Sequence, residues 1–145
     1  MEVTLLDIPG LSHTDQAVWR VRALAIDGKS PCLAALAAWA KFDIKAYKKI
    51  LNVLRLVGSV NRVTNEDKVT KCAIDGLGHV YEARADKLKA RLFFFYSEED
   101  ESVVVVTNSY EKGKGSQDSA FQRCDALREV YINSRHEQNS RRRNH

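Results

Sequence analysis

The chain has 145 residues, of which 44% are hydrophobic and 29% charged, and its formal net charge is +4. This composition is typical of a globular domain and excludes a disordered chain. The longest apolar run, LAALAAWA from Leu33, is far shorter than the ~20 residues of a membrane-spanning helix. The N-terminus also lacks the basic and apolar segments of a secretory signal. We therefore expect a cytoplasmic protein that contacts no membrane.

The cysteines and histidines indicate neither a disulfide framework nor a metal site. The three cysteines are isolated and odd in number, and none belongs to a CxxC pair: Cys32, Cys72 and Cys124. The four histidines lie too far apart for a helical metal motif such as HExxH. We expect small core cysteines, no bound metal and no cofactor.

The positive charge is concentrated at the C-terminal end. Residues 135–145 hold four arginines and one glutamate, which gives this segment +3 of the net charge. We expect a single domain over residues 1–134 and a basic flexible tail over residues 135–145. Such a tail binds RNA or phosphate, or is simply solvated, and the sequence leaves both readings open.

The first third of the chain mixes strand and helix signals. Residues 3–8, VTLLDI, are typical of a short strand. The segment HTDQAVWRVRALAIDG, residues 13–28, is interpreted as a helix, with a strand over residues 17–25 as the alternative. Ser30 and Pro31 form a good helix opening, which predicts a short helix over residues 33–41.

A second helix is the clearest element. Asp43 can cap it, apolar residues recur at helical spacing from Ile44 to Leu54, and Gly58 occupies a typical C-terminal position. Its other face carries a basic stripe: Lys45, Lys48, Lys49, Asn52 and Arg55. The stripe is either a solvated face, the reading helix of a DNA-binding helix-turn-helix, or an RNA-binding surface.

The second half is rich in strands. Residues 79–84, 89–96 and 102–110 are β-branched or aromatic segments separated by short polar turns, which predicts an antiparallel meander. The middle strand is apolar on both faces and should be central. Residues 116–132 have the spacing of a helix that packs on the sheet. The predicted fold is α+β, with an N-terminal helical hairpin on a small, mainly antiparallel sheet and a C-terminal helix.

Common catalytic motifs are absent. The run AIDGKS ends like a phosphate-binding P-loop, but Ala23 stands where that motif requires glycine. There is no GxGxxG dinucleotide motif and no GxSxG nucleophile elbow. The remaining constellation is the Tyr-Glu-x-Arg segment at Tyr81, the arginine that opens the next strand at Arg91, and the Tyr-x-Lys-Gly-Lys segment at Tyr110.

The order and spacing of these segments resemble the RelE/ParE toxin superfamily, and most closely its HigB-like, phage-derived branch. The resemblance covers roughly residues 35–132. The matching positions are Tyr81, Glu82, Arg84, Arg91, Tyr110 and Lys112. Three features depart from the pattern: Gly113 interrupts the usual lysine pair, the proline before the last helix is missing, and residues 1–30 form an extension.

The resemblance implies a metal-independent endoribonuclease that cleaves mRNA, associated with the ribosome, and inhibits translation. It also implies a cognate antitoxin, a small helix-turn-helix protein. The arginines suit a phosphate, the loop lysines suit backbone binding or proton transfer, and Tyr110 suits base stacking. The expected catalytic residues are Arg84, Arg91, Lys112, Tyr110 and His79, and the expected RNA-binding residues are Lys114, Lys45, Lys48, Lys49 and Arg55.

Two other functions remain open at this point. The same fold inhibits DNA gyrase in the ParE-like mode, which needs no catalytic cations. A non-catalytic module of phage origin would instead hold nucleic acid or a protein through the basic helix and the arginine-rich tail. The ParE-like mode predicts that the cationic residues are dispensable. The binding module predicts binding that weakens steeply with salt and is lost without the tail from Arg135, with little dependence on the loop lysines.

Overall fold

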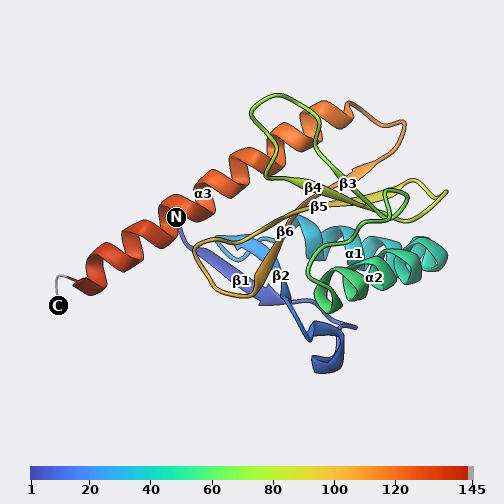
Figure 1. The fold of residues 1–145 in the computed structure, drawn as a ribbon. Coiled ribbons are helices and arrows are strands. Elements are labelled where there is room, and N and C mark those ends of the chain that lie inside the picture. The colour runs from blue at the N-terminus through green and yellow to red at the C-terminus, as the bar shows by residue number, and fades with distance from the viewer. Residues whose placement is uncertain (144–145) are drawn as a thin grey trace.

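The computed structural model describes residues 1–143 and contains one six-stranded mixed sheet with helices on both faces (Figure 1). The strands are β1 (Val3–Asp7), β2 (Arg20–Ile26), β3 (Val69–Lys71), β4 (Tyr81–Arg84), β5 (Ala90–Tyr96) and β6 (Val103–Glu111). The helices are the 3-10 helix η1 (His13–Gln16), α1 (Pro31–Phe42), α2 (Ile44–Ser59) and α3 (Gln117–Arg143). Helices α1 and α2 cover one face, and α3 crosses the other.

The sheet is mainly antiparallel, as predicted. Its strand order is β1-β2-β6-β5-β4-β3, and the pairing of β2 with β6 is parallel whereas the other pairings are antiparallel. The α+β class and the C-terminal helix are confirmed. The predicted N-terminal position of the helical hairpin is not confirmed, because strands β1 and β2 precede α1. The residues expected to form an extension thus supply two strands of the sheet.

The helix predicted over residues 13–28 is wrong, and the alternative strand is close to the observed one. Only η1 is helical there, and β2 runs between β1 and β6. The reason lies in the pattern VRALAI, which is apolar on both faces. Val21 and Ala23 pack against α1 and α2, whereas Leu24 packs on the α3 side. Such burial on both faces is typical of strands with a parallel partner.

Strand β5 separates two hydrophobic cores. Leu92 and Phe94 pack on the α1 and α2 side, and Phe93 and Phe95 pack on the α3 side. All four are at most 1% exposed. Since full burial of one such side chain contributes about 1.5–3 kcal/mol, this strand fixes the sheet between its two helical layers. The prediction of a central strand buried on both faces is confirmed.

Gly58 lies inside α2 rather than after its end, in contrast to the prediction. Its carbonyl oxygen accepts hydrogen bonds from the backbone nitrogens of Val18 and Trp19, each at 3.0 Å. A Cβ atom at this position would lie 2.6 Å from the carbonyl oxygen of Asp15. Glycine is therefore required because the N-terminal segment approaches the helix backbone closely.

Helix α3 continues to Arg143, so residues 135–143 of the predicted basic tail are helical in this structure; residues 144–145 lie outside the described part of the chain. Arg135 Nε donates to Asp100 Oδ2 at 2.8 Å, and His136 Nε2 lies 2.9 Å from Glu99 Oε2. The acidic β5–β6 turn thus anchors the helix beyond the sheet edge. None of the helices in residues 1–143 is long and apolar enough to cross a membrane.

Candidate functional site

Arg84, Arg91 and Tyr110 form one row across three neighbouring strands. Arg84 on β4 is the direct partner of Arg91 on β5, and Arg91 is in turn the partner of Tyr110 on β6. Directly opposed residues present their side chains on the same face of a sheet. The row therefore places two guanidiniums and a phenol on the face that α3 covers, at the end of the sheet where β4 and β6 finish.

A buried carboxylate lies among these cations. Glu82 is fully buried, and its Oε1 lies 3.5 Å from Arg84 Nε and 4.0 Å from Arg91 Nε. Its Oε2 accepts a hydrogen bond from Gln117 Nε2 of α3 at 3.0 Å. Neither Glu82 Oε1 nor Arg84 Nε has a hydrogen-bond partner among the described residues. Burial of this carboxylate was not predicted, because the nearby Arg84, Lys87 and Lys89 favour a surface ion pair.

Arg91 is a buried member of this cluster. Its side chain is 3% exposed, and its Nη1 donates to the carbonyl oxygens of Leu88 and Ala90. Burial, and then the neighbouring Arg84, lower the pKa of Arg91. A guanidinium enclosed in this way orients its neighbours rather than binding a large substrate. Its observed position therefore differs from the expected role at the phosphate.

Arg84 reaches solvent and lines a cleft of about 330 Å³ with residues of α2 and of the loop before β3. Its side chain retains 30% exposure. Lys49 lines the same cleft, and its Nζ lies 3.6 Å from Asp86 Oδ2. The basic stripe of α2 therefore contributes Lys49 to the cleft that Arg84 lines. Lys68 also lines the cleft, and its carbonyl oxygen accepts the Arg84 backbone N–H at 2.8 Å.

The contribution of Lys68 was missed because β3 was missed. Three residues give no usable alternation pattern, and the strand is recognisable only by its pairing with β4. The polar run before β3 gave one local signal, its Asn-Glu-Asp sequence, which is typical of a turn. That signal marks a bend but does not indicate which strand the bend approaches.

The Lys112–Lys114 loop follows the row directly. The Lys112 backbone nitrogen donates to the Lys89 carbonyl oxygen at 2.9 Å, and the Tyr110 hydroxyl donates to the Gly115 carbonyl oxygen at 3.2 Å. Both lysine side chains are exposed, and Lys114 Nζ lies 3.1 Å from Glu111 Oε2. Gly113 and Gly115 have φ values of 94° and 89°, which glycine adopts without strain. Tyr110 therefore closes the loop that presents Lys112.

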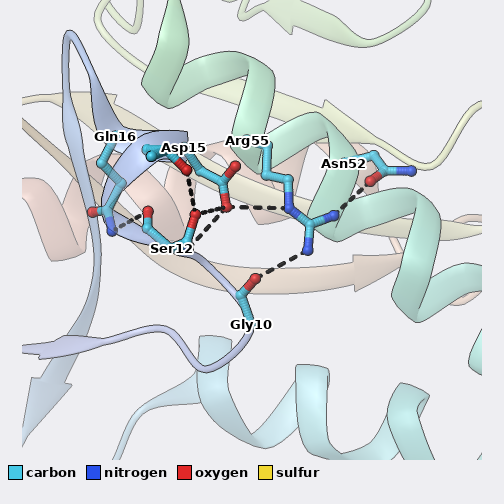
Figure 2. Close-up of polar contacts among 7 residues, drawn as sticks. Gly10, Ser12, Asp15, Gln16, Asn52 and Arg55 are labelled. Atoms are coloured by element: carbon cyan, nitrogen blue, oxygen red, sulfur yellow. Dashed lines mark hydrogen bonds and ion pairs between the residues drawn. The ribbon is translucent and has the colours of Figure 1, made fainter.

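Arg55 belongs to a different contact network, although the sequence placed it on the RNA-binding stripe (Figure 2). Its Nη1 donates to Asn52 Oδ1 at 2.6 Å, its Nη2 to the Gly10 carbonyl oxygen at 3.0 Å, and its Nε to Asp15 Oδ2 at 3.4 Å. Hydrogen bonds from the Ser12 backbone and side chain lower the pKa of Asp15. This guanidinium ties the N-terminal segment to α2 and is occupied by protein acceptors.

His79 lies at the other end of the sheet. It precedes β4, whereas Arg84 ends that strand, and it lines a separate cavity with Tyr81 and Tyr96. Strand β4 separates them, and the extended backbone from Tyr81 to Arg84 spans about 10 Å, so His79 lies away from the arginine row. Lys45 and Lys48 lie exposed on α2. The structure therefore places Arg84, Arg91 and Tyr110 in one row, with the Lys112 loop directly after it and Lys49 in the cleft that Arg84 lines. His79 and Arg55 lie elsewhere.

Comparison with known proteins identifies no relative. No family model, curated protein or solved structure matches this chain. Among residues 1–143, no three His, Cys, Asp or Glu side chains lie close enough together to hold a metal ion. The function is therefore inferred from the residues and geometry of the site itself.

Proposed function

We propose that this protein is a toxin that cleaves mRNA at the end of the sheet where Arg84, Arg91 and Tyr110 form their row. The observation that carries the proposal is this row, flanked by the exposed Lys112 loop and by the Arg84 cleft. Arg84, Lys49 and Lys68 line that cleft, and its volume of about 330 Å³ is large enough for a phosphodiester. Arginine binds two phosphate oxygens at once, which makes it well suited to this substrate.

The chemistry requires three contributions at one phosphate. The 2′-oxygen attacks phosphorus and its proton leaves to a base, the P–O5′ bond breaks, and the leaving 5′-oxygen takes up a proton. The products are a 2′,3′-cyclic phosphate and a free 5′-hydroxyl. Arg84 stabilises the extra negative charge of the pentavalent phosphorus, and Lys112 donates the proton to the leaving oxygen.

Asp67 and Asp86 are the two carboxylates that line the Arg84 cleft, and Asp86, two residues after Arg84, accepts the proton of the 2′-hydroxyl in this scheme. Arg91 and Glu82 act as positioning residues. The buried carboxylate of Glu82 attracts the Arg84 guanidinium and so holds it in place. The Arg91 guanidinium lies near the same carboxylate oxygen and also balances its negative charge. Lys49 and Lys114 bind the neighbouring RNA backbone.

The cellular setting follows from the resemblance in the order of segments. The protein acts in the cytoplasm on ribosome-associated mRNA, and an antitoxin with a helix-turn-helix domain holds it inactive. Residues 1–134 have a net charge of only +1, so the ribosome, rather than long-range attraction, positions the substrate.

Growth inhibition upon induced expression tests this proposal. Arg84→Ala and Lys112→Ala should each abolish inhibition, whereas Lys41→Ala, which changes an exposed lysine of α1, should retain it. Coexpression of a neighbouring antitoxin gene should restore growth of cells that express the unaltered protein. Continued inhibition by a well-expressed Arg84→Ala, Lys112→Ala double variant would contradict the proposed site.

A further inference from the structure

A second cavity, of about 250 Å³, lies at the end of the sheet opposite the arginine row. Aromatic side chains form one part of its lining and potential cations form another: Trp19, Tyr81 and Tyr96, with Arg62, His79 and Arg128. These residues come from the segment before β2, the segment after α2, the loop before β4, strands β4 and β5, and helix α3. The proposed cleavage step uses none of them.

The aromatic side chains form a continuous cluster. The ring centroid of Tyr96 lies 4.9 Å from that of Trp19 and 5.2 Å from that of Tyr81. The guanidinium carbon of Arg62 lies 3.8 Å from the Tyr96 centroid and 5.1 Å from the Trp19 centroid. A planar cation held in this way stacks well against a further flat ring, because nucleobases stack on guanidinium planes as well as on aromatic rings.

The cations have few acceptors within the protein. Arg62 donates to the Asn61 carbonyl oxygen at 2.8 Å and forms no ion pair with the described residues. Arg128 is 17% exposed, and its Nη1 lies 3.9 Å from Asp125 Oδ1, which is too long for a hydrogen bond. A guanidinium that is largely removed from water and lacks a close acceptor favours an anionic ligand.

The other polar groups of the cavity are also mostly donors. Within residues 1–143, the hydroxyls of Tyr81 and Tyr96 and the ring nitrogens of His79 form no hydrogen bond that meets normal geometry. Burial raises the pKa of Tyr96, so its hydroxyl stays a donor at neutral pH. Glu98 is the one carboxylate among the described lining residues. The lining therefore suits a ligand that is flat at one end and anionic at the other.

We propose that this cavity binds one nucleoside monophosphate unit, with the base stacked on Arg62 and the phosphate held by Arg128 and His79. The unit is either a free nucleotide or the phosphorylated end of an RNA strand, because both present the same base and phosphate. The cavity has room for one such unit rather than for a longer strand.

Isothermal calorimetry with the full chain tests the proposal. AMP should bind saturably, and adenosine or inorganic phosphate should each bind at least about tenfold more weakly, because each lacks one of the two recognised groups. Arg128→Gln and Arg62→Ala should each weaken AMP binding about tenfold or more. Arg123→Gln, which changes a neighbouring exposed arginine of α3 that lines a different cavity, should leave it unchanged.

A fluorescence titration tests whether the ligand binds in this cavity. The chain has two tryptophans, so Trp39→Phe leaves Trp19 as the single reporter, and its emission should change in parallel with the calorimetric isotherm. A 5′-phosphorylated trinucleotide distinguishes the two sources: tighter binding than AMP indicates an RNA end, and weaker binding indicates a free nucleotide.

Two results would overturn the proposal. One is that neither AMP nor the trinucleotide gives a saturable heat signal at millimolar concentration. The other is binding that survives both Arg62→Ala and Arg128→Gln in variants whose circular dichroism is unchanged. Growth inhibition by Arg128→Gln should be retained, so failure of this inference leaves the proposed cleavage site unaffected.

Discussion

Arg84 and Arg91 oppose each other directly across β4 and β5, and both lie within 4.0 Å of the same buried carboxylate oxygen of Glu82. Two like charges in direct opposition destabilise a sheet unless a third group compensates them. Glu82 supplies this compensation, and Gln117 fixes its second oxygen. The cationic end of the sheet is therefore one interdependent unit, and its members should respond differently to substitution.

Glu82→Gln should destabilise the fold. The change leaves the buried Arg91 without its carboxylate, and removal of one partner of a buried ion pair costs about 3–5 kcal/mol. Urea unfolding followed by circular dichroism measures the loss. Asp7→Asn is the matched control, because its carboxylate is 89% exposed and pairs with Arg22 at 3.5 Å, so it should change stability by less than about 1 kcal/mol. Equal effects of the two substitutions would contradict the buried cluster.

Lys112→Ala should reduce RNA cleavage without a comparable loss of stability. Its side chain is exposed and makes no contact that the fold requires, so the free energy of unfolding should change by less than about 0.5 kcal/mol. Cleavage should nevertheless fall by about a hundredfold or more, since the leaving oxygen loses its proton donor. Cleavage rates on a labelled RNA, set against unfolding curves, provide the test. A variant that cleaves normally would exclude Lys112 from the chemistry.

Gly58→Ala should destabilise the protein by about 1–3 kcal/mol. The new Cβ would lie 2.6 Å from the Asp15 carbonyl oxygen, which is backbone and cannot rotate away. On an exposed helix face alanine would instead stabilise, so the sign of the change is diagnostic. Thermal unfolding measures it, with Lys48→Ala on the exposed face of α2 as the control. A stabilised Gly58→Ala variant would show that the N-terminal segment does not dock as described.

Asp100→Asn should release the end of α3. Asp100 accepts hydrogen bonds from Arg135 and Tyr131. Burial, and then the hydrogen bond to Asp100, raise the pKa of Tyr131. Hydrogen exchange should accelerate over residues 131–143 and stay unchanged in β5 and β6. Glu101→Gln, an exposed neighbour in the same turn, should have no such effect. Unchanged exchange in Asp100→Asn would mean that the contacts of the turn do not hold the helix.

The cysteines should be unreactive in the folded protein. Burial raises the pKa of the Cys32 and Cys124 thiols to about 12, and all three cysteines are buried. Since the thiolate is the reactive form, labelling by a thiol reagent at pH 8 should follow unfolding and become rapid in urea. Fast labelling of the native protein at two or more sites would contradict this packing.

Local patterns predicted the parts of the fold that local chemistry determines. Ser30 Oγ caps α1 at the Leu33 nitrogen, and Asp43 Oδ1 caps α2 at the Ala46 nitrogen, as the sequence indicated. The apolar run of β5 predicted a central strand because only such a strand buries both faces. Strand β2 is also buried on both faces, and it was harder to predict because its VRALAI pattern lacks the alternation by which strands are usually recognised.

Contacts between distant segments were not predictable in this way. Arg55 looked free because its acceptors Gly10 and Asp15 lie 45 and 40 residues earlier in the chain. Glu82 looked exposed because its burial depends on α3, which supplies Gln117 from 35 residues later. The sequence therefore indicated which residues carry charge, whereas the fold determines which of those charges remain free to meet a substrate.

The most direct test of the cleavage site is primer extension on a defined mRNA in a coupled translation extract, with the purified protein, its Arg84→Ala variant and the Lys41→Ala control. Discrete cuts that appear with the unaltered protein and with Lys41→Ala, but not with Arg84→Ala, are the predicted result. Intact mRNA in every lane, or cuts that persist without the arginine, would contradict cleavage at this site. If the mRNA stays intact in every lane, inhibition of DNA gyrase supercoiling would be the function to examine.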